Sequence, residues 1–221
     1  MIVRELISDS LPPVKSSDTA AMALAWMNEF KISQLPIIDQ GGFVGIVTEN
    51  DILDAVNPEA QVAEIKYTGL DGAYIYQGQH IYDAIDIMSN LELELLPVLD
   101  EEKGFLGVIT LRDLIQFLDQ LFAIREPGSI LVLEIPERGY MLSEIARIVE
   151  NNDAKVLSLY LTPDPGKRGF LLTLKLNVED LSRVIATFER FQYQVAHTYN
   201  RLSNNEDLRS NLDALMRYLD I

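Results

Sequence analysis

The nine residues FVGIVTEND, from Phe43 to Asp51, return 62 positions later (110 − 48 for the threonines) as FLGVITLRD, from Phe105 to Asp113. Each copy is an apolar run interrupted by one glycine, and each ends in the pattern T-x-x-D. A short apolar run favours a strand, and threonine followed three residues later by an acid is typical of a helix start. An internal repeat of a strand leading into a helix therefore organises the first half of the chain.

The repeat extends upstream of these strands. QLPIID (34–39) matches LLPVLD (95–100), with the two prolines 61 positions apart (97 − 36). Before the first copy, Ala20, Ala23, Leu24 and Met27 share one helical face, and the last three match Ala84, Ile85 and Met88. Asp18 is the expected N-cap of that first helix. One repeat alone leaves an apolar sheet face exposed, so we expect the two repeats to pack face to face.

Each copy follows the pattern h-P-h-h-D, a turn and F-h-G-h-h-T-x-x-D-h, in which h is a hydrophobic residue and x is any residue. Two copies of this pattern resemble a tandem pair of CBS domains, a Bateman module, over residues 2–120. The paired repeats of this family bind adenosine-containing ligands such as AMP, ATP or S-adenosylmethionine. The resemblance assigns each aspartate to ribose, each threonine and its neighbours to phosphate, and the residues around h-P-h and before each first helix to the base. The binding residues that it implies are Ser16, Gln34, Leu35, Pro36, Thr48, Asn50, Asp51, Ile75, Gln77, His80, Leu95, Leu96, Pro97, Thr110, Arg112 and Asp113.

The T-x-x-D pattern also has a purely structural interpretation, in which it caps a helix and binds nothing. The two interpretations are compatible, because amides at a helix start attract phosphate and a nearby carboxylate can accept ribose hydroxyls. Nucleotide-binding members of the family often carry a cation just before h-P-h, whereas this chain has Ser33-Gln34 and Glu94-Leu95 there. Arg112 favours a phosphate at the second motif, and Glu94 opposes it.

Composition excludes several classes of protein. The 221 residues are 48% hydrophobic and carry a net charge of −16, which argues against nucleic acid and anionic membrane surfaces as partners. The chain contains no cysteine, so disulfides and zinc–thiolate sites are ruled out. The first residues lack a signal-peptide pattern and no run approaches the length of a membrane helix, so we expect a cytoplasmic protein.

The pattern changes after Pro127-Gly128, which we take as a domain boundary. Apolar segments between Ile130 and Tyr199 follow the order β-α-β-β-α-β, which predicts a ferredoxin-like sandwich. This order after two CBS repeats resembles an ACT domain, a family that binds small effectors, often amino acids. ACT effector sites usually carry Asp-x-x-Gly after the first strand, and this chain has residues 137–140, Glu-Arg-Gly-Tyr, which favours an oligomerisation module instead.

The last segment has a capping box at Ser203 and Glu206 and then an apolar helical stripe at Leu208, Leu212, Leu215, Met216 and Leu219. We expect this helix to pack on its own domain or on a dimer mate. Among other polar residues, His80 and His197 lack metal partners at ligand spacing, and 100–102 is the acidic turn DEE. No catalytic triad, P-loop or catalytic carboxylate pair is present, which predicts a protein that is not an enzyme and needs no cofactor or metal.

The sequence therefore predicts a mixed α/β (α+β) chain with CBS repeats over 1–60 and 61–126, an ACT-like domain over 127–200 and a helix over 201–221. The arrangement resembles acetoin-utilisation-type CBS-ACT regulatory proteins. We expect a homodimeric regulator that binds an adenosine nucleotide or S-adenosylmethionine and acts on an unidentified protein. Two alternatives stay open: an amino-acid sensor acting through the ACT-like domain, and a dimerisation module with no small ligand.

Overall fold

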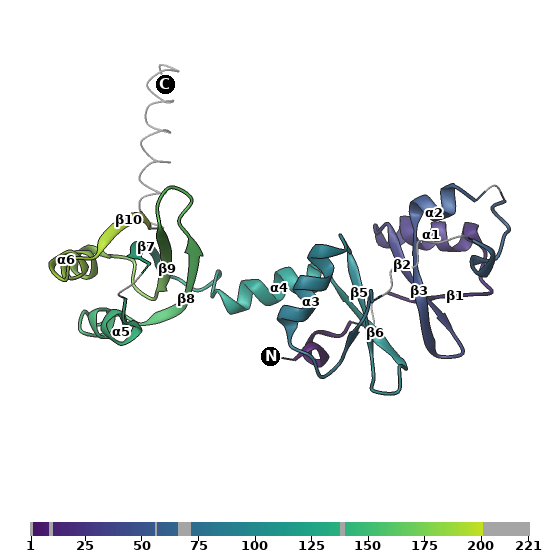
Figure 1. Cartoon of the computed structure of the whole chain (residues 1–221), viewed down its shortest axis with the longest axis horizontal. Coiled ribbons are helices and arrows are strands. Elements are labelled where there is room, and N and C mark those ends of the chain that lie inside the picture. Colours follow the sequence, from purple (N-terminus) through teal and green to yellow (C-terminus); the bar gives the residue numbers. More distant parts are fainter. Residues whose placement is uncertain (1, 9–10, 56, 66–71, 138–139, 201–221) are drawn as a thin grey trace, which may run out of the picture. The chain divides into compact units, whose positions relative to one another are not determined.

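The computed structural model describes residues 2–8, 11–55, 57–65, 72–137 and 140–200 (Figure 1). Contacts divide the chain into two compact units, Met1–Phe117 and Leu118–Ile221. The expected C-terminal helix lies outside the described residues. No helix in the described ranges is long and apolar enough to cross a membrane.

The first unit contains the two predicted repeats, each with a three-stranded sheet. The first sheet has the order β1-β2-β3 and the second β4-β5-β6. In both, a short strand pairs parallel to the h-P-h strand, and that strand forms an antiparallel hairpin with the glycine-bearing strand. The elements of the first repeat are η1 Val3–Leu6, β1 Val14–Lys15, α1 Ala20–Phe30, β2 Gln34–Asp39, β3 Gly42–Thr48 and α2 Glu49–Leu53. Those of the second are η2 Val62–Glu64, β4 Ile75–Tyr76, α3 Ile81–Asn90, β5 Leu95–Leu99, β6 Phe105–Thr110 and α4 Leu111–Leu121. The boundary between the two units falls within α4, after Phe117.

The N-cap of α1 is Thr19, so the prediction of Asp18 was wrong by one residue. Thr19 Oγ1 accepts a hydrogen bond from Met22 N at 3.2 Å. Asp18 Oδ2 instead accepts from Lys15 N at 2.7 Å and closes the turn that precedes the helix. Short polar side chains suit both tasks, and the direction in which the chain enters the helix decides between them.

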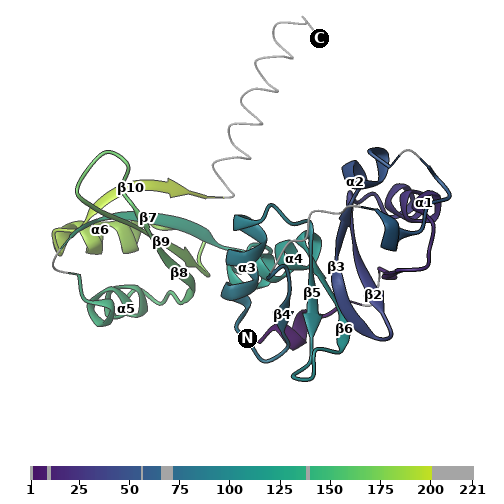
Figure 2. The same ribbon diagram turned by 45° about the vertical axis from the view of Figure 1, so that its right-hand side comes forward.

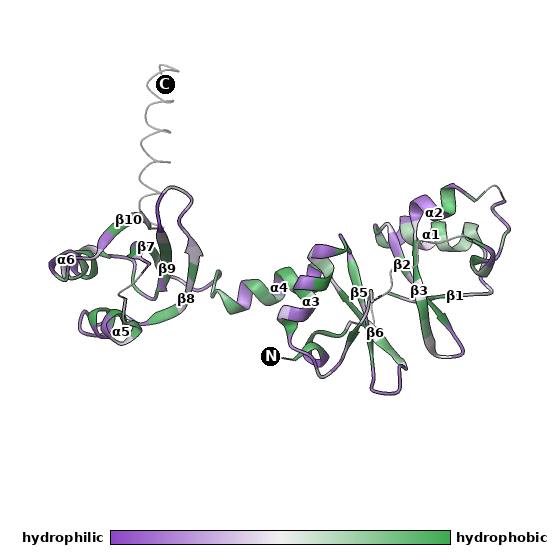
Figure 3. Ribbon diagram, viewed as in Figure 1, coloured by the Kyte–Doolittle hydropathy of each residue, from purple (hydrophilic) through white to green (hydrophobic). Residues whose placement is uncertain are grey.

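The repeats meet through their h-P-h strands, since β2 and β5 contact each other and the two sheets lie side by side (Figure 2). The hairpin turns also touch, because Phe105 N donates to Gly41 O at 3.1 Å. Apolar residues dominate the strands, and polar residues dominate the turns (Figure 3). All five residues of β5 are buried, as is expected of a central strand covered on both faces.

The first residues of the chain pair with the second repeat. Val3 N donates to Gln79 O at 2.9 Å, and Ser8 N donates to Val108 O at 2.9 Å. Val3 is fully buried. The N-terminal segment thus ties the start of the chain to a repeat that begins some 60 residues later, which strengthens the cohesion of the first unit.

The second unit has the predicted β-α-β-β-α-β order. Its elements are β7 Ser129–Pro136, α5 Leu142–Glu150, β8 Val156–Pro163, β9 Gly169–Leu176, α6 Ser182–Arg190 and β10 Gln194–Tyr199. The sheet order is β10-β7-β9-β8 with every pair antiparallel. The two helices cover one sheet face, where alternate strand residues form the core with Ile145, Val149, Val184 and Phe188. The ferredoxin-like topology is therefore confirmed.

Gly128 marks the entry into this sheet. Its φ is 139°, a region that side chains rarely adopt, and a Cβ there would collide with the carbonyl oxygen of Leu176. The glycine predicted from the sequence as a boundary is thus required by the close approach of two backbones.

Candidate functional site

Both T-x-x-D motifs form the same reciprocal capping box. Thr48 N and Oγ1 donate to Asp51 Oδ2 at 2.8 and 2.7 Å, and Asp51 N donates back to Thr48 Oγ1 at 3.1 Å. Thr110 and Asp113 repeat the pattern at 2.9, 2.6 and 3.2 Å. The capping interpretation is therefore confirmed at the starts of α2 and α4.

Capping leaves one carboxylate oxygen of each motif for another task. Oδ2 accepts both bonds from the threonine, whereas Oδ1 of Asp51 and of Asp113 receives no hydrogen bond within the described part of the chain. Both aspartates are partly exposed. A partly exposed carboxylate oxygen without a partner can accept a hydrogen bond from a sugar hydroxyl. Each threonine hydroxyl already donates its one proton to the aspartate, so toward a ligand it can act only as an acceptor.

The strand register brings h-P-h against these motifs. Gln34 pairs with Thr48 in the first hairpin, and Leu95 pairs with Thr110 in the second. The residue before each strand is tied to the following helix, because Glu49 N donates to Ser33 O at 2.8 Å and Leu111 N donates to Glu94 O at 3.0 Å. In both repeats, the structure thus places the h-P-h strand next to the T-x-x-D motif, as the predicted site requires.

The other residues predicted to bind the ligand differ in what they can offer. Six of them have buried side chains and can present only backbone atoms, namely Leu35, Pro36, Ile75, Leu95, Leu96 and Pro97. Ser16 and Gln77 are half-buried, and Asn50 and Arg112 are exposed on the first turns of α2 and α4. His80 caps α3, since its Nδ1 accepts from Tyr82 N at 3.2 Å, and its ring lies edge-on to that of Tyr82.

One contact at this site was missed by sequence reasoning. Glu94 Oε2 accepts from Ser33 N at 2.8 Å, across 61 residues. In return, Gln34 Oε1 accepts from Glu94 N at 3.0 Å, and Gln34 Nε2 donates to Glu92 O at 3.4 Å. These bonds join the two repeats beside their T-x-x-D motifs. Position 94 was identified in the sequence, but the direction of its side chain had no local signal.

A hollow of about 340 Å³ adjoins the first motif. It contains three carboxylates, and none of its lining residues is a cation; the lining residues are Asp51, Asp54, Ala55, Asn57, Ala60, Glu64 and Ile65. No group of three or more histidine, aspartate and glutamate residues in the described ranges is placed to hold a metal ion. The first motif therefore lies in an acidic environment.

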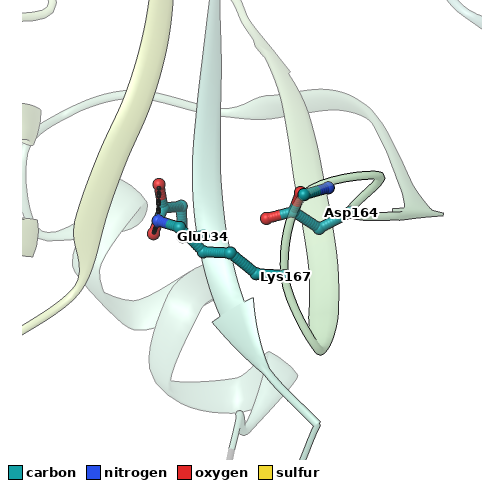
Figure 4. A network of polar contacts seen from close by, with 4 residues as sticks. Glu134, Asp164 and Lys167 are labelled. Atoms are coloured by element: carbon teal, nitrogen blue, oxygen red, sulfur yellow. Dashed lines mark hydrogen bonds and ion pairs between the residues drawn. The ribbon is translucent and has the colours of Figure 1, made fainter.

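The second unit has a cleft of its own, of about 470 Å³, where the ends of β7, β9 and β10 meet the β8–β9 turn. Lys167 Nζ lies 2.7 and 2.9 Å from the carboxylate oxygens of Glu134 on one side, and Asp164 lies in the same turn (Figure 4). The hydrogen bond to Glu134 raises the pKa of Lys167. On the other side, burial and the 2.8 Å hydrogen bond to Glu144 raise the pKa of Tyr193 to about 12. Four separate segments build this cleft, so the sequence held no compact motif for it.

Loss of one cap should measurably destabilise the first unit. Thr110→Val removes the hydroxyl that accepts from Asp113 N, and the loss of such a cap lowers the free energy of unfolding by about 0.5–2 kcal/mol. Urea unfolding measures the change, with Thr110→Ser as the control because it keeps the hydroxyl. Equal stability of the two variants would contradict a capping role.

Comparison with known proteins decides the family of the first unit. The family model of the CBS domain matches twice, at residues 3–58 and 72–120. An uncharacterized 17.7 kDa protein of Acidianus ambivalens is 31% identical over 118 residues, which cover 52% of this chain and 72% of that protein. The chain belongs to the CBS domain family. Its two repeats are a tandem CBS pair, as the sequence predicted.

Other relatives share the CBS pair with this chain. Inosine-5'-monophosphate dehydrogenase of Methanocaldococcus jannaschii is 27% identical over 113 residues, which cover 51% of this chain but 22% of the dehydrogenase. Since the chain spans about a fifth of that enzyme, the match does not transfer its activity. Among solved structures, a CBS domain pair/ACT domain protein of Thermotoga maritima aligns with a TM-score of 0.50 and 25% identity over 53% of this chain and 96% of that one.

Proposed function

We propose that this CBS protein is a non-catalytic regulator whose paired repeats bind an adenosine-containing ligand of the AMP, ATP or S-adenosylmethionine class. One observation carries the proposal: at the same point of both repeats, a partly exposed aspartate is held by its threonine through Oδ2, and Oδ1 has no hydrogen-bond partner among the described residues. A helix cap alone requires one acceptor oxygen. The second oxygen is well suited to a ribose hydroxyl, and the buried strand beside it offers backbone groups to a base.

The proposed mechanism is differential binding. A ligand at either motif lies beside the bonds of Ser33, Gln34 and Glu94, which join the two repeats. If it prefers one arrangement of these bonds, it shifts the population of the pair toward that arrangement. The regulated protein would respond to this change.

Isothermal titration calorimetry tests the ligand class directly. The purified chain is titrated with adenosine, AMP, ATP, S-adenosylmethionine and a cyclic dinucleotide, and the same series is run on the double variant Asp51→Ala and Asp113→Ala. We expect at least one adenosine compound to bind the natural chain and none to bind the variant. Asp86→Ala is the control, because Asp86 is exposed on α3 and its carboxylate accepts a hydrogen bond from Asn90 of the same helix. Binding that survives the double substitution would refute the site.

We also propose that the second unit is an ACT-like domain that supports a homodimer, in an arrangement of the acetoin-utilisation type. Its ferredoxin-like topology and the Thermotoga maritima CBS pair/ACT relative support this. The expected mass by light scattering is about twice the 25.0 kDa of one chain. A single species near 25.0 kDa at tens of micromolar would contradict it.

The cleft of the second unit favours one alternative, a small effector such as an amino acid. Asp164 and Arg168 line it, and the Arg168 guanidinium makes no ion pair or hydrogen bond within the described chain. A thermal-shift panel of amino acids against adenosine compounds separates this function from the first. A chain that responds to neither set would instead be a dimerisation module without a small ligand.

A further inference from the structure

We propose that Glu94 makes the two adenosine sites unequal in charge. The first motif would then take an adenosine compound with a neutral or cationic 5′ substituent and disfavour a phosphate, and the second motif would accept a phosphate. The inference rests on the proposed function and adds the ligand chemistry of each site. Its basis is the side chain of Glu94, a residue of the second repeat whose carboxylate accepts a hydrogen bond from the backbone of the first repeat.

Ser33 and Glu94 occupy equivalent positions, 61 residues apart, directly before the h-P-h strands. The carbonyl of each accepts from the first helical residue of its own motif, Glu49 or Leu111. Both residues therefore lie next to a T-x-x-D motif. By sequence alone, the charge of Glu94 counts against a phosphate at the second motif.

The structure instead ties this charge to the first repeat. The Glu94 carboxylate accepts from Ser33 N at 2.8 Å, and Ser33 is the residue bonded to the start of α2 in the first motif. Gln34, which is neutral, extends the opposite way and bonds to the backbone of Glu92 and Glu94. Each repeat thus hydrogen-bonds to the other through one of these side chains, and the Glu94 carboxylate is held at Ser33, whose carbonyl accepts from the first helical residue of the first motif.

The Glu94 carboxylate is also constrained in this position. Ser33 is half-buried, and Glu94 supplies the acceptor for its N–H. If the carboxylate moved away to admit a phosphate, that N–H would lose its partner, which is costly for a partly buried donor. The charge is therefore a lasting feature of the first site.

The charges on the first turns of α2 and α4 act in the same direction. Glu49, Asp51 and Glu94 give the first motif three negative groups, and the adjoining hollow adds Asp54 and Glu64. At the second motif, Arg112 balances Asp113. The equivalent turn residues Lys31 and Glu92 carry the opposite order of charge, but both precede the h-P-h strands and lie outside the first turns of α2 and α4. A phosphate therefore meets repulsion at the first motif that an uncharged adenosine does not.

The experiment isolates each motif and varies only the ligand charge. Calorimetry at low ionic strength uses adenosine, AMP and S-adenosylmethionine on Asp113→Ala, which retains the first motif, and on Asp51→Ala, which retains the second. We expect the first motif to bind adenosine and S-adenosylmethionine at least 10-fold more tightly than AMP. The second motif should bind AMP at least as tightly as adenosine.

Glu94→Gln then tests the residue itself. Glutamine can still accept from Ser33 N through Oε1, so the substitution removes the charge and keeps the hydrogen bond. In the Asp113→Ala background, Glu94→Gln should increase the affinity for AMP about 10-fold and leave the affinity for adenosine nearly unchanged. Glu92→Gln is the matched control, because it removes an exposed charge two residues away and should leave the ratio of AMP to adenosine affinity as it was.

The outcomes separate the two proposals. Two results would overturn the role of Glu94 while adenosine still binds. One is an equal ratio of AMP to adenosine affinity at both motifs, and the other is an AMP affinity that Glu94→Gln leaves unchanged. If no adenosine compound binds either single-motif variant or the natural chain, the proposed function itself fails.

Discussion

Replacing Asp113 by alanine is expected to weaken AMP binding by about 10- to 150-fold. The substitution removes the carboxylate oxygen that faces the proposed ribose, and a hydrogen bond to a charged group contributes about 1.5–3 kcal/mol. Asp51→Ala should weaken AMP less, because Arg112 stands only in the second motif and Glu94 lies beside the first. Titration calorimetry of the two variants measures the difference.

Asp113→Asn separates binding from capping in the same experiment. Asparagine can accept both bonds from Thr110 through its one carbonyl oxygen, so the start of α4 keeps its cap. Its amide nitrogen then occupies the place of the free carboxylate oxygen and cannot accept a hydroxyl. We expect near-normal stability and weak binding. Normal AMP affinity in Asp113→Asn, or a larger loss in Asp51→Ala, would contradict the assignment of the phosphate ligand to the second motif.

Phe188→Ala is expected to lower the free energy of unfolding of the second unit by about 3–5 kcal/mol. Phe188 is 0% exposed in the core between α6 and the sheet, and its ring lies edge-on to that of Tyr193 at 5.6 Å. Truncation leaves a cavity that rigid strands cannot fill. Urea unfolding followed by hydrogen exchange of the β7 and β9 amides measures the change.

Phe191→Ala is the matched control for this substitution. Phe191 lies three residues further on, and its side chain is 40% exposed. Its loss should cost well under half as much, since little buried surface is removed. A change below about 1 kcal/mol in Phe188→Ala would show that this core does not hold the second unit together. Ligand binding by the CBS pair is expected to persist in both variants.

Much of this protein follows from short stretches of its sequence. The repeat, the strand–helix order of both units and the two capping boxes depend on contacts that close within a few residues or on periodic apolar side chains. Such patterns are visible in a linear sequence because a strand alternates every two residues and a helix returns every 3.6. For example, the hydrogen bond between Thr48 and Asp51 closes within four residues, so the spacing of the two residues in the sequence is enough to predict it.

Tertiary structure alone decided three features of this protein. The N-terminal residues pair with the second repeat, the Glu94 carboxylate crosses to Ser33, and four distant segments enclose the cleft around Lys167. Each depends on how separate elements pack, and packing sets a side chain's direction only after the strands lie together. The sequence by itself determined the CBS family, the order of strands and helices, and the two T-x-x-D caps. The position of the Glu94 carboxylate was decided by the fold, because its hydrogen bond to Ser33 spans 61 residues and no local pattern encodes it.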